Sequence, residues 1–152
     1  MDEILDDYKV TQLPLNKGLV VAHGTKIHSV LQFMREQKTG CILIKKGDKY
    51  TGIFTEHDFV RLLFEKHSWD KSIEDVATPN PWVIQSDMHL KDAIVLMKEK
   101  NIRHIPVFEK TESLVGVLSV RSVIKLIAEH FPADVMNLPP RLHKDPKTPE
   151  GG

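Results

Sequence analysis

Cysteine is nearly absent from the 152 residues, and the one present, Cys41, has no partner for a disulfide within the chain. It lies in the apolar run CILI at 41–44, where we expect a buried, unreactive thiol rather than a nucleophile. A chain without disulfides suits a reducing compartment, so we expect a cytoplasmic protein.

Net charge is absent too, because 21 Lys and Arg residues balance 21 Asp and Glu residues. This balance removes the broad attraction that drives most binding to nucleic acids and anionic membranes, so we expect neither partner. The opening MDEILDD has neither the positive flank nor the long apolar core of a signal peptide or membrane span. With 41% hydrophobic and 28% charged residues, the composition is typical of a folded soluble protein.

Signatures of catalysis and of metal binding are also missing. The eight histidines are scattered, with no His-x-x-x-His pair, and there is no Cys-x-x-Cys. No serine has the flanking glycines of a nucleophile elbow, and GLVVAHG at 18–24 lacks the spacing of a phosphate-binding loop. We therefore expect no enzyme activity, no metal site and no required cofactor.

An internal repeat is the main feature that is present. The segment starting at Lys26 aligns with the segment starting at His89 at an offset of 63 residues, which becomes 64 after one extra loop residue. In each copy the apolar periodicity predicts the order β-α-β-β-α. The expected fold class is therefore α+β, with two repeats packed about a pseudo-twofold axis, since one copy alone would be marginally stable.

The expected strands and helices occupy matching places in the two copies. We predict strands at 19–22, 41–44 and 50–54 and at 82–85, 105–108 and 114–118. We predict amphipathic helices around 30–34 and 93–97, and a last helix of each copy over about 56–67 and 120–131. Thr25 and Asp87 are the predicted N-caps of the first helix in each copy.

The domain boundaries follow from the repeat and from the prolines. We place the first repeat at 10–68, a linker at 69–75, the second repeat at 76–131 and a tail at 132–152. Pro79 and Pro81 interrupt any helix and favour extended backbone before the second repeat. The tail contains several prolines and few apolar residues, so we expect it to be partly disordered.

The stretch GIFTEHD at 52–58 ends a predicted strand and begins a helix, and its counterpart GVLSVRS at 116–122 lacks the carboxylate. Two interpretations of Thr55 and Asp58 remain open. In the first interpretation, Thr55 and Asp58 form a capping box at the start of the helix. Alternatively, Asp58 binds a ligand, because a carboxylate accepts both hydroxyls of a ribose through charged hydrogen bonds worth on the order of 1.5–3 kcal/mol. Both roles can coexist.

Together, the repeat, GIFTEHD, DVATPNPWVI at 75–84 and NIRHIPV at 101–107 resemble a tandem pair of CBS domains over about residues 10–131. The resemblance implies a stand-alone regulatory module that performs no chemistry and forms a homodimer. It implies an adenosine-containing ligand in the clefts between the halves, with AMP first and ADP, ATP or S-adenosylmethionine as related candidates. It also implies a role in energy sensing, in which an unidentified effector protein responds to ligand binding.

The resemblance assigns residues to two unequal clefts. In the first, Asp58 holds the ribose, and arginines suit the phosphate because their planar fork binds two oxygens. The residues of the first cleft are Thr55, Asp58, Arg103, His104, Arg121, Lys17 and Gly18. The residues of the second, predicted to be weaker because Ser122 replaces the carboxylate, are Thr78, Pro81, Ser119, Ser122 and His57.

The sequence leaves alternatives open for the cleft residues, for the number of occupied clefts and for the function. Arg103 and Arg121 can be solvated charges beside helices, and His104 a packed strand residue. Whether one or both clefts bind a ligand is open. The competing function is a dimerisation and interaction module with no physiological nucleotide ligand, in which Thr55 and Asp58 serve only as a helix cap.

Overall fold

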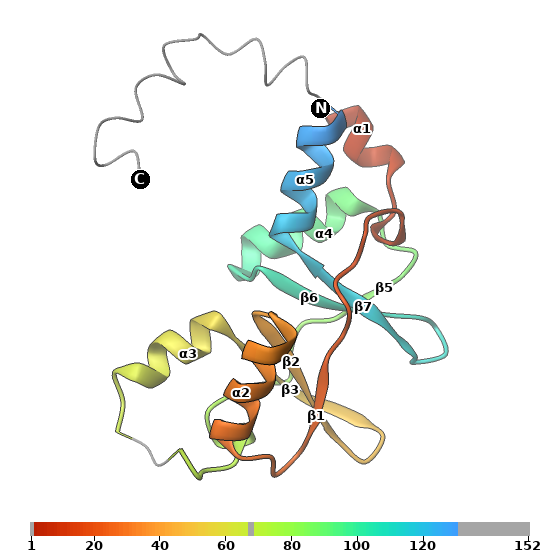
Figure 1. Cartoon of the computed structure of the whole chain (residues 1–152). Coiled ribbons are helices and arrows are strands. Elements are labelled where there is room, and N and C mark those ends of the chain that lie inside the picture. The colour runs from red at the N-terminus through yellow and green to blue at the C-terminus, as the bar shows by residue number, and fades with distance from the viewer. Residues whose placement is uncertain (1, 67–68, 131–152) are drawn as a thin grey trace, which may run out of the picture. The chain divides into compact units, whose positions relative to one another are not determined.

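The computed structural model describes residues 2–66 and 69–130 (Figure 1). Residues up to Ser119 form one compact unit, and a second unit begins at Val120. The predicted tail at 132–152 lies outside the described residues, as do the predicted helix ends at His67 and Phe131.

The first unit contains two sheets. The first sheet has the order β1-β2-β3-β4. Its strands are β1 (Val20–Ala22), β2 (Cys41–Lys46), β3 (Lys49–Thr55) and β4 (Thr78–Pro79). β1 runs parallel to β2, while β2–β3 and β3–β4 are antiparallel. β4 was not predicted, because its two residues carry no periodicity of their own; Pro79 is tolerated there because β4 is an edge strand.

Two helices follow strands of the first sheet (Figure 1). They are α2 (Ile27–Gln37), which packs on β2, and α3 (Glu56–Leu63), which follows β3 directly. α3 is shorter than predicted and has Phe64 as its C-cap. The core of this repeat consists of nine buried residues: Ile27, Val30, Met34, Ile42, Ile44, Phe54, Leu62, Ile73 and Val76. Ile73 lies in the short helix η2 (Ile73–Asp75), so the segment that we predicted to be a linker supplies one core residue.

The second sheet has the order β5-β6-β7, formed by β5 (Ile84–Gln85), β6 (His104–Phe108) and β7 (Leu114–Ser119). β5 and β6 are parallel, and β6 and β7 are antiparallel. The helix α4 (Leu90–Lys100) joins β5 to β6. The last helix, α5 (Val120–His130), belongs to the second unit.

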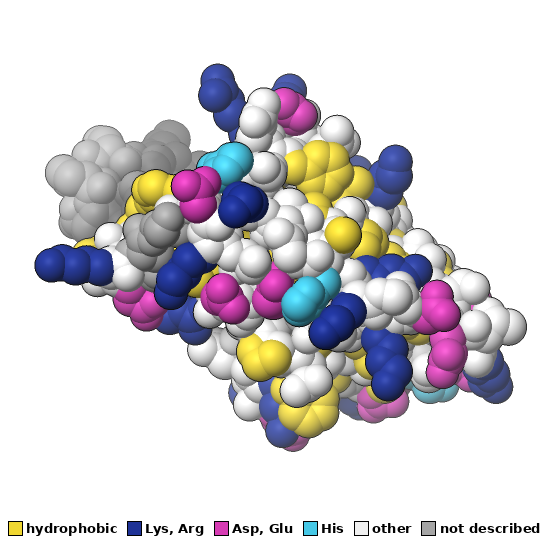
Figure 2. All heavy atoms as spheres, turned by 90° about the horizontal axis from the view of Figure 1, so that it is seen from below, with side chains coloured by type: hydrophobic (Ala, Val, Ile, Leu, Met, Phe, Trp, Pro, Cys, Tyr) yellow, Lys and Arg dark blue, Asp and Glu magenta, His cyan; other side chains and the backbone are white. Residues whose placement is uncertain are grey.

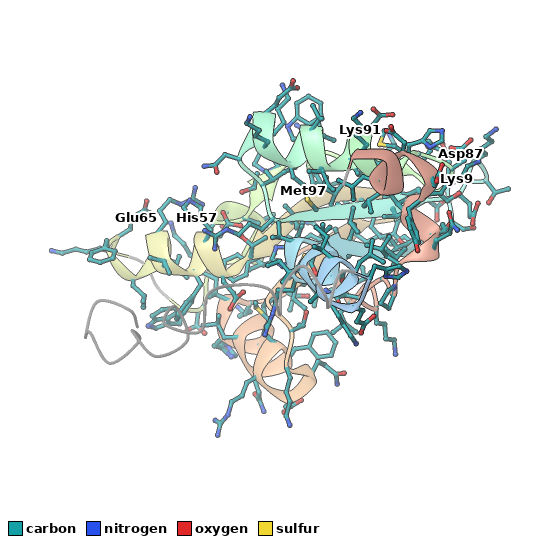
Figure 3. All side chains as sticks on the ribbon, turned by 90° about the horizontal axis from the view of Figure 1, so that it is seen from above. Lys9, His57, Glu65, Asp87, Lys91 and Met97 are labelled. Atoms are coloured by element: carbon teal, nitrogen blue, oxygen red, sulfur yellow. The ribbon has the colours of Figure 1, made fainter. Side chains whose placement is uncertain are left out.

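The start of the chain packs on the second repeat. It forms α1 (Asp2–Asp7) and the short helix η1 (Val10–Gln12). The N–H of Leu90 donates to the carbonyl of Tyr8 at 2.8 Å, and Lys91 of α4 pairs with Asp6 at 3.3 Å (Figure 3). The segment before β1 therefore completes the second repeat, just as the segment before β5 completes the first.

An apolar cluster joins the two sheets within the first unit. It contains Cys41, Leu43, Ile53 and Val117, with Val20, Tyr50 and Leu114 packed against it. The ring of Tyr50 also meets that of Phe108 edge to face, with 5.1 Å between the ring centroids. The described residues thus form two sheets with helices, and the predicted α+β class and its repeated element order are confirmed.

The predicted helix N-caps are wrong. The N-caps of α2 and α4 are Lys26 and His89, whose side chains make no capping hydrogen bond. Thr25 instead stabilises the turn after β1, where its hydroxyl donates to the carbonyl of Ala22 at 2.6 Å. Asp87 pairs with Lys110 at 3.6 Å. Both side chains are used in turns before the helices begin, which local propensity alone does not distinguish from caps.

The surface carries charges of both signs. On the face shown in Figure 2, basic and acidic side chains are interspersed. Within residues 2–66 and 69–130, no helix has both the length and the apolar composition required to cross a membrane.

Candidate functional site

Asp58, in the first turn of α3, is the centre of the candidate site. The residue is only 3% exposed. Its Oδ2 accepts the backbone N–H of Thr55 at 2.9 Å and the Thr55 hydroxyl at 3.3 Å. Its Oδ1 accepts the Thr78 hydroxyl at 2.8 Å and Nη2 of Arg61 at 3.3 Å. A buried carboxylate therefore has a donor on every side, as burial of a charge requires.

The junction of β3 and α3 explains why this carboxylate is buried. Phe54, fully buried, ends the apolar part of β3, and Thr55 still has extended backbone (φ −120°) as the N-cap of α3. The bond from the Thr55 N–H to Asp58 is the reciprocal half of a capping box. The capping interpretation of Thr55 and Asp58 is confirmed, and it leaves a ligand-binding role for Asp58 as a prediction.

Arg61 and Thr78 connect the site to the segment after α3. Nη2 of Arg61 also donates to the carbonyl of Val76 at 2.8 Å. Thr78 reaches Asp58 because β4 pairs with β3, with Thr78 opposite Ile53. We predicted Thr78 for the second cleft, but the structure groups it with Asp58. Sequence analysis missed Arg61, although its position three residues after Asp58 on a helix was the available signal.

Lys17 and Gly18, predicted for the first cleft, follow a residue that pairs with β7 of the second sheet. The preceding residue, Asn16, exchanges two backbone hydrogen bonds of 2.9 Å with Val117 of β7. A Cβ at Gly18 would meet the side chain of Leu114, which would have to move to make room for it. Lys17 is exposed. Their predicted role in the first cleft stays a prediction.

Arg103 and His104 lie at the start of β6. Arg103 is exposed and His104 is half-buried, opposite Ser119 in the strand register. The pKa of His104 lies below its usual value, because burial disfavours the imidazolium and the charge of Arg103 adds to this, while the carboxylate of Glu56 opposes it. The charge of Glu56, at the start of α3, thus acts on His104 at the start of β6.

We expect an NMR titration of the His104 ring to give a midpoint below the ordinary value of about 6.5. The unfolded chain then binds a proton at higher pH than the native chain, so stability is complete above about pH 6.5 and falls as the pH drops below it. Arg103→Gln should raise the midpoint and Glu56→Gln should lower it. A midpoint at or above 6.5 in the native protein would contradict this account.

The remaining predicted residues are spread over several elements. His57 is exposed on α3 (Figure 3), and Pro81 is half-buried before β5. Ser119 is buried at the end of β7. Arg121 and Ser122 occupy the first turn of α5, the former exposed and the latter buried. Their roles as ligand contacts stay predictions.

Cys41 is a buried free thiol, and the described histidines are not part of a cluster of metal ligands. Cys41 is 6% exposed, and burial, with the nearby charge of Asp58, raises its pKa to about 12. It is therefore a thiol at neutral pH, as predicted. In residues 2–66 and 69–130, no three of the His, Cys, Asp and Glu side chains gather as ligands for a metal ion.

A cavity of about 230 Å³ lies at the first sheet. Its lining residues are His23, Lys46, Thr51, Gly52, Glu74, Ala77, Thr78 and Pro79. His23 and Glu74 pair there at 3.4 Å. The volume is below the range of about 300–1,000 Å³ that is usual for small-molecule sites, and Thr78 is the one lining residue that we predicted for a cleft.

Comparison with known proteins supports the family assignment. The CBS domain family matches twice, at residues 9–65 and 73–129. A 17.7 kDa uncharacterized protein of Acidianus ambivalens is 25% identical over 122 residues, which cover 80% of this chain and 74% of the relative. The chain spans only 33% and 49% of two further curated relatives, from Rickettsia prowazekii and Methanopyrus kandleri.

Two solved structures show the same fold. A CBS domain protein from Pyrobaculum aerophilum, complexed with AMP, has a TM-score of 0.70 and 22% identity, covering 76% of this chain and 89% of that one. The CBS domain pair of protein MJ0100, in complex with 5′-methylthioadenosine and S-adenosyl-L-methionine, also has a TM-score of 0.70 and 22% identity, covering 81% and 98%. With both repeats matched, the chain belongs to the CBS domain family.

Proposed function

We propose that this chain is a regulatory module that binds an adenosine-containing ligand at Asp58 and signals its presence to a partner protein. AMP is the first candidate, with ADP, ATP and S-adenosylmethionine as related ones. The observation that carries the proposal is a buried carboxylate that begins α3, with Thr55 beside it. The complexes of the two solved neighbours with AMP and with adenosine thioethers support the ligand class.

Each residue has a chemical role in the proposal. Asp58 accepts the ribose hydroxyls, and Arg103, the neutral His104 and Arg121 supply donors to the phosphate. The matching positions in the second repeat, Ser119 and Ser122, offer no carboxylate, so we propose that the second cleft is weaker. Cytoplasmic location, a homodimer and an effector that reads the bound state belong to the same proposal.

Calorimetric titration with the four candidate ligands tests it. We expect one ligand to bind with near-unit stoichiometry, and Asp58→Ala to weaken binding about tenfold to a hundredfold through loss of charged hydrogen bonds. Asp48→Ala, an exposed carboxylate in the turn between β2 and β3, is the matched control and should bind as the native protein does. No heat with any ligand at protein concentrations well above micromolar would reject the proposal.

A second candidate function is a dimerisation module without a nucleotide. The observation in its favour is a row of exposed apolar side chains at the end of α3, where Val60, Leu63 and Phe64 are 52%, 55% and 86% exposed. Sedimentation equilibrium with and without AMP separates the candidates. A dimer that forms regardless of ligand, together with silent calorimetry, would favour this second function.

A further inference from the structure

The four donors to Asp58 are of two kinds. Two are fixed: the Thr55 N–H belongs to the backbone that begins α3, and Arg61 is anchored by its second bond to the Val76 carbonyl. Two are hydroxyls, those of Thr55 and Thr78, which rotate about a single bond. Each carboxylate oxygen holds one donor of each kind, since Oδ2 has the Thr55 N–H and hydroxyl, and Oδ1 has Arg61 and the Thr78 hydroxyl.

No place on this carboxylate is free. A carboxylate offers about four lone-pair positions, and the four donors occupy them in a side chain that is 3% exposed. A ribose that binds here must displace two donors. Displacing the fixed ones would uncap α3 or detach Arg61 from Asp58, whereas a threonine hydroxyl leaves the carboxylate when its side chain rotates about the Cα–Cβ bond.

We infer that the hydroxyls of Thr55 and Thr78 are placeholders for the vicinal diol of a ribose. On binding, one sugar hydroxyl replaces the Thr55 hydroxyl at Oδ2, and the other replaces the Thr78 hydroxyl at Oδ1. The number of hydrogen bonds to the carboxylate does not change. This inference rests on the proposed function and adds Thr78, from β4, as a residue that sets the affinity and the sugar specificity of the site.

The exchange has a consequence for deoxy sugars. Sites that hydrogen-bond a substrate hydroxyl usually reject the analogue that lacks it, because a buried polar group is left without a partner. Here the threonine returns to the oxygen that a missing sugar hydroxyl leaves empty. Discrimination against 2′-deoxy-AMP and 3′-deoxy-AMP is therefore expected to be weak, about tenfold or less for each.

Thr78→Val tests this directly, because valine has the shape of threonine and no hydroxyl. We expect the variant to bind AMP severalfold more tightly, since the competing donor at Oδ1 is gone. We also expect it to bind one of the two deoxy analogues at least about tenfold worse relative to AMP than the native protein does, because Oδ1 then loses a partner. The measurement is calorimetric titration of the native protein and the variant with all three nucleotides.

Two control variants are titrated beside Thr78→Val. Thr111→Val removes an exposed hydroxyl in the turn between β6 and β7, and Thr78→Ser keeps a hydroxyl at the site; both should behave as the native protein does. Thr78→Ala replaces Thr78→Val if thermal melting shows the latter to be unfolded. Weaker AMP binding by Thr78→Val, or by Thr78→Ala where it replaces it, would show that Thr78 contacts the ligand and would overturn the inference. Unchanged ratios of affinity among the three nucleotides would also overturn it. A native protein that binds no nucleotide would instead reject the proposed function itself.

Discussion

Phe54→Ala is expected to lower the free energy of unfolding by about 3–5 kcal/mol. Phe54 is fully buried in the core of the first repeat, in one cluster with Ile42 of β2 and Leu62 of α3, so its replacement by alanine leaves a cavity and loses apolar burial. It also directly precedes Thr55, and loosening it should disturb the capping box that holds Asp58. Urea denaturation, followed by circular dichroism, measures the change.

Phe64→Ala is the matched control, since Phe64 is 86% exposed at the end of α3. Its expected cost is below about 0.5 kcal/mol. The two variants should be compared at several protein concentrations. Equal costs for both would contradict the core assigned to Phe54, and a cost of Phe64→Ala that grows with protein concentration would show that Phe64 is buried in an interface between copies.

The sequence alone predicted the helices and strands whose apolar residues recur with a clear period. Amphipathic spacing and the repeat located α2, α4 and the central strands, and the repeat extends to details of the backbone. Lys38 and Asn101, which end α2 and α4 and lie 63 residues apart, both have φ of 53°. Local pattern and local structure agree here because both arise from contacts within one copy.

Contacts between distant segments were beyond the sequence analysis. The Thr78 hydroxyl reaches Asp58 across 20 positions in the chain, and no periodicity in TPN at 78–80 indicates that it pairs with β3. The backbone hydrogen bonds between Asn16 and Val117 likewise join segments that are distant in the sequence. Such pairings depend on how the sheet edges are covered, which is a property of the whole fold.

The function of Asp58 as a cap does not compete with its proposed function as a ligand contact. A charge that is 3% exposed in the free protein needs donors of its own. The capping N–H and Arg61 provide permanent ones, and the two hydroxyls provide exchangeable ones. If the proposed function holds, the motif Thr-x-x-Asp at this strand-to-helix junction both caps α3 and presents a carboxylate that can accept a diol.

Ile73→Ala is expected to lower the free energy of unfolding by about 2–5 kcal/mol, and Ile73→Val by about 0.5–1.5 kcal/mol. Ile73 lies in the segment that sequence analysis assigned to a linker, yet it is fully buried in the core of the first repeat. Its N–H also donates to the Thr25 carbonyl at 2.8 Å, which holds η2 against the start of α2. Urea denaturation of both variants measures the two changes in the free energy of unfolding, of which that of Ile73→Ala should be the larger.

Val95→Ala on α4, where Val95 is 45% exposed, is the control and should cost less than about 0.5 kcal/mol. A similarly small cost for Ile73→Ala would contradict the place of Ile73 in the core. The result also bears on the site, because the same segment continues through the Val76 carbonyl to Thr78. A segment anchored by Ile73 places the Thr78 hydroxyl on Asp58 without further ordering, so loosening that anchor should weaken the bond from Thr78 before it affects the capping box.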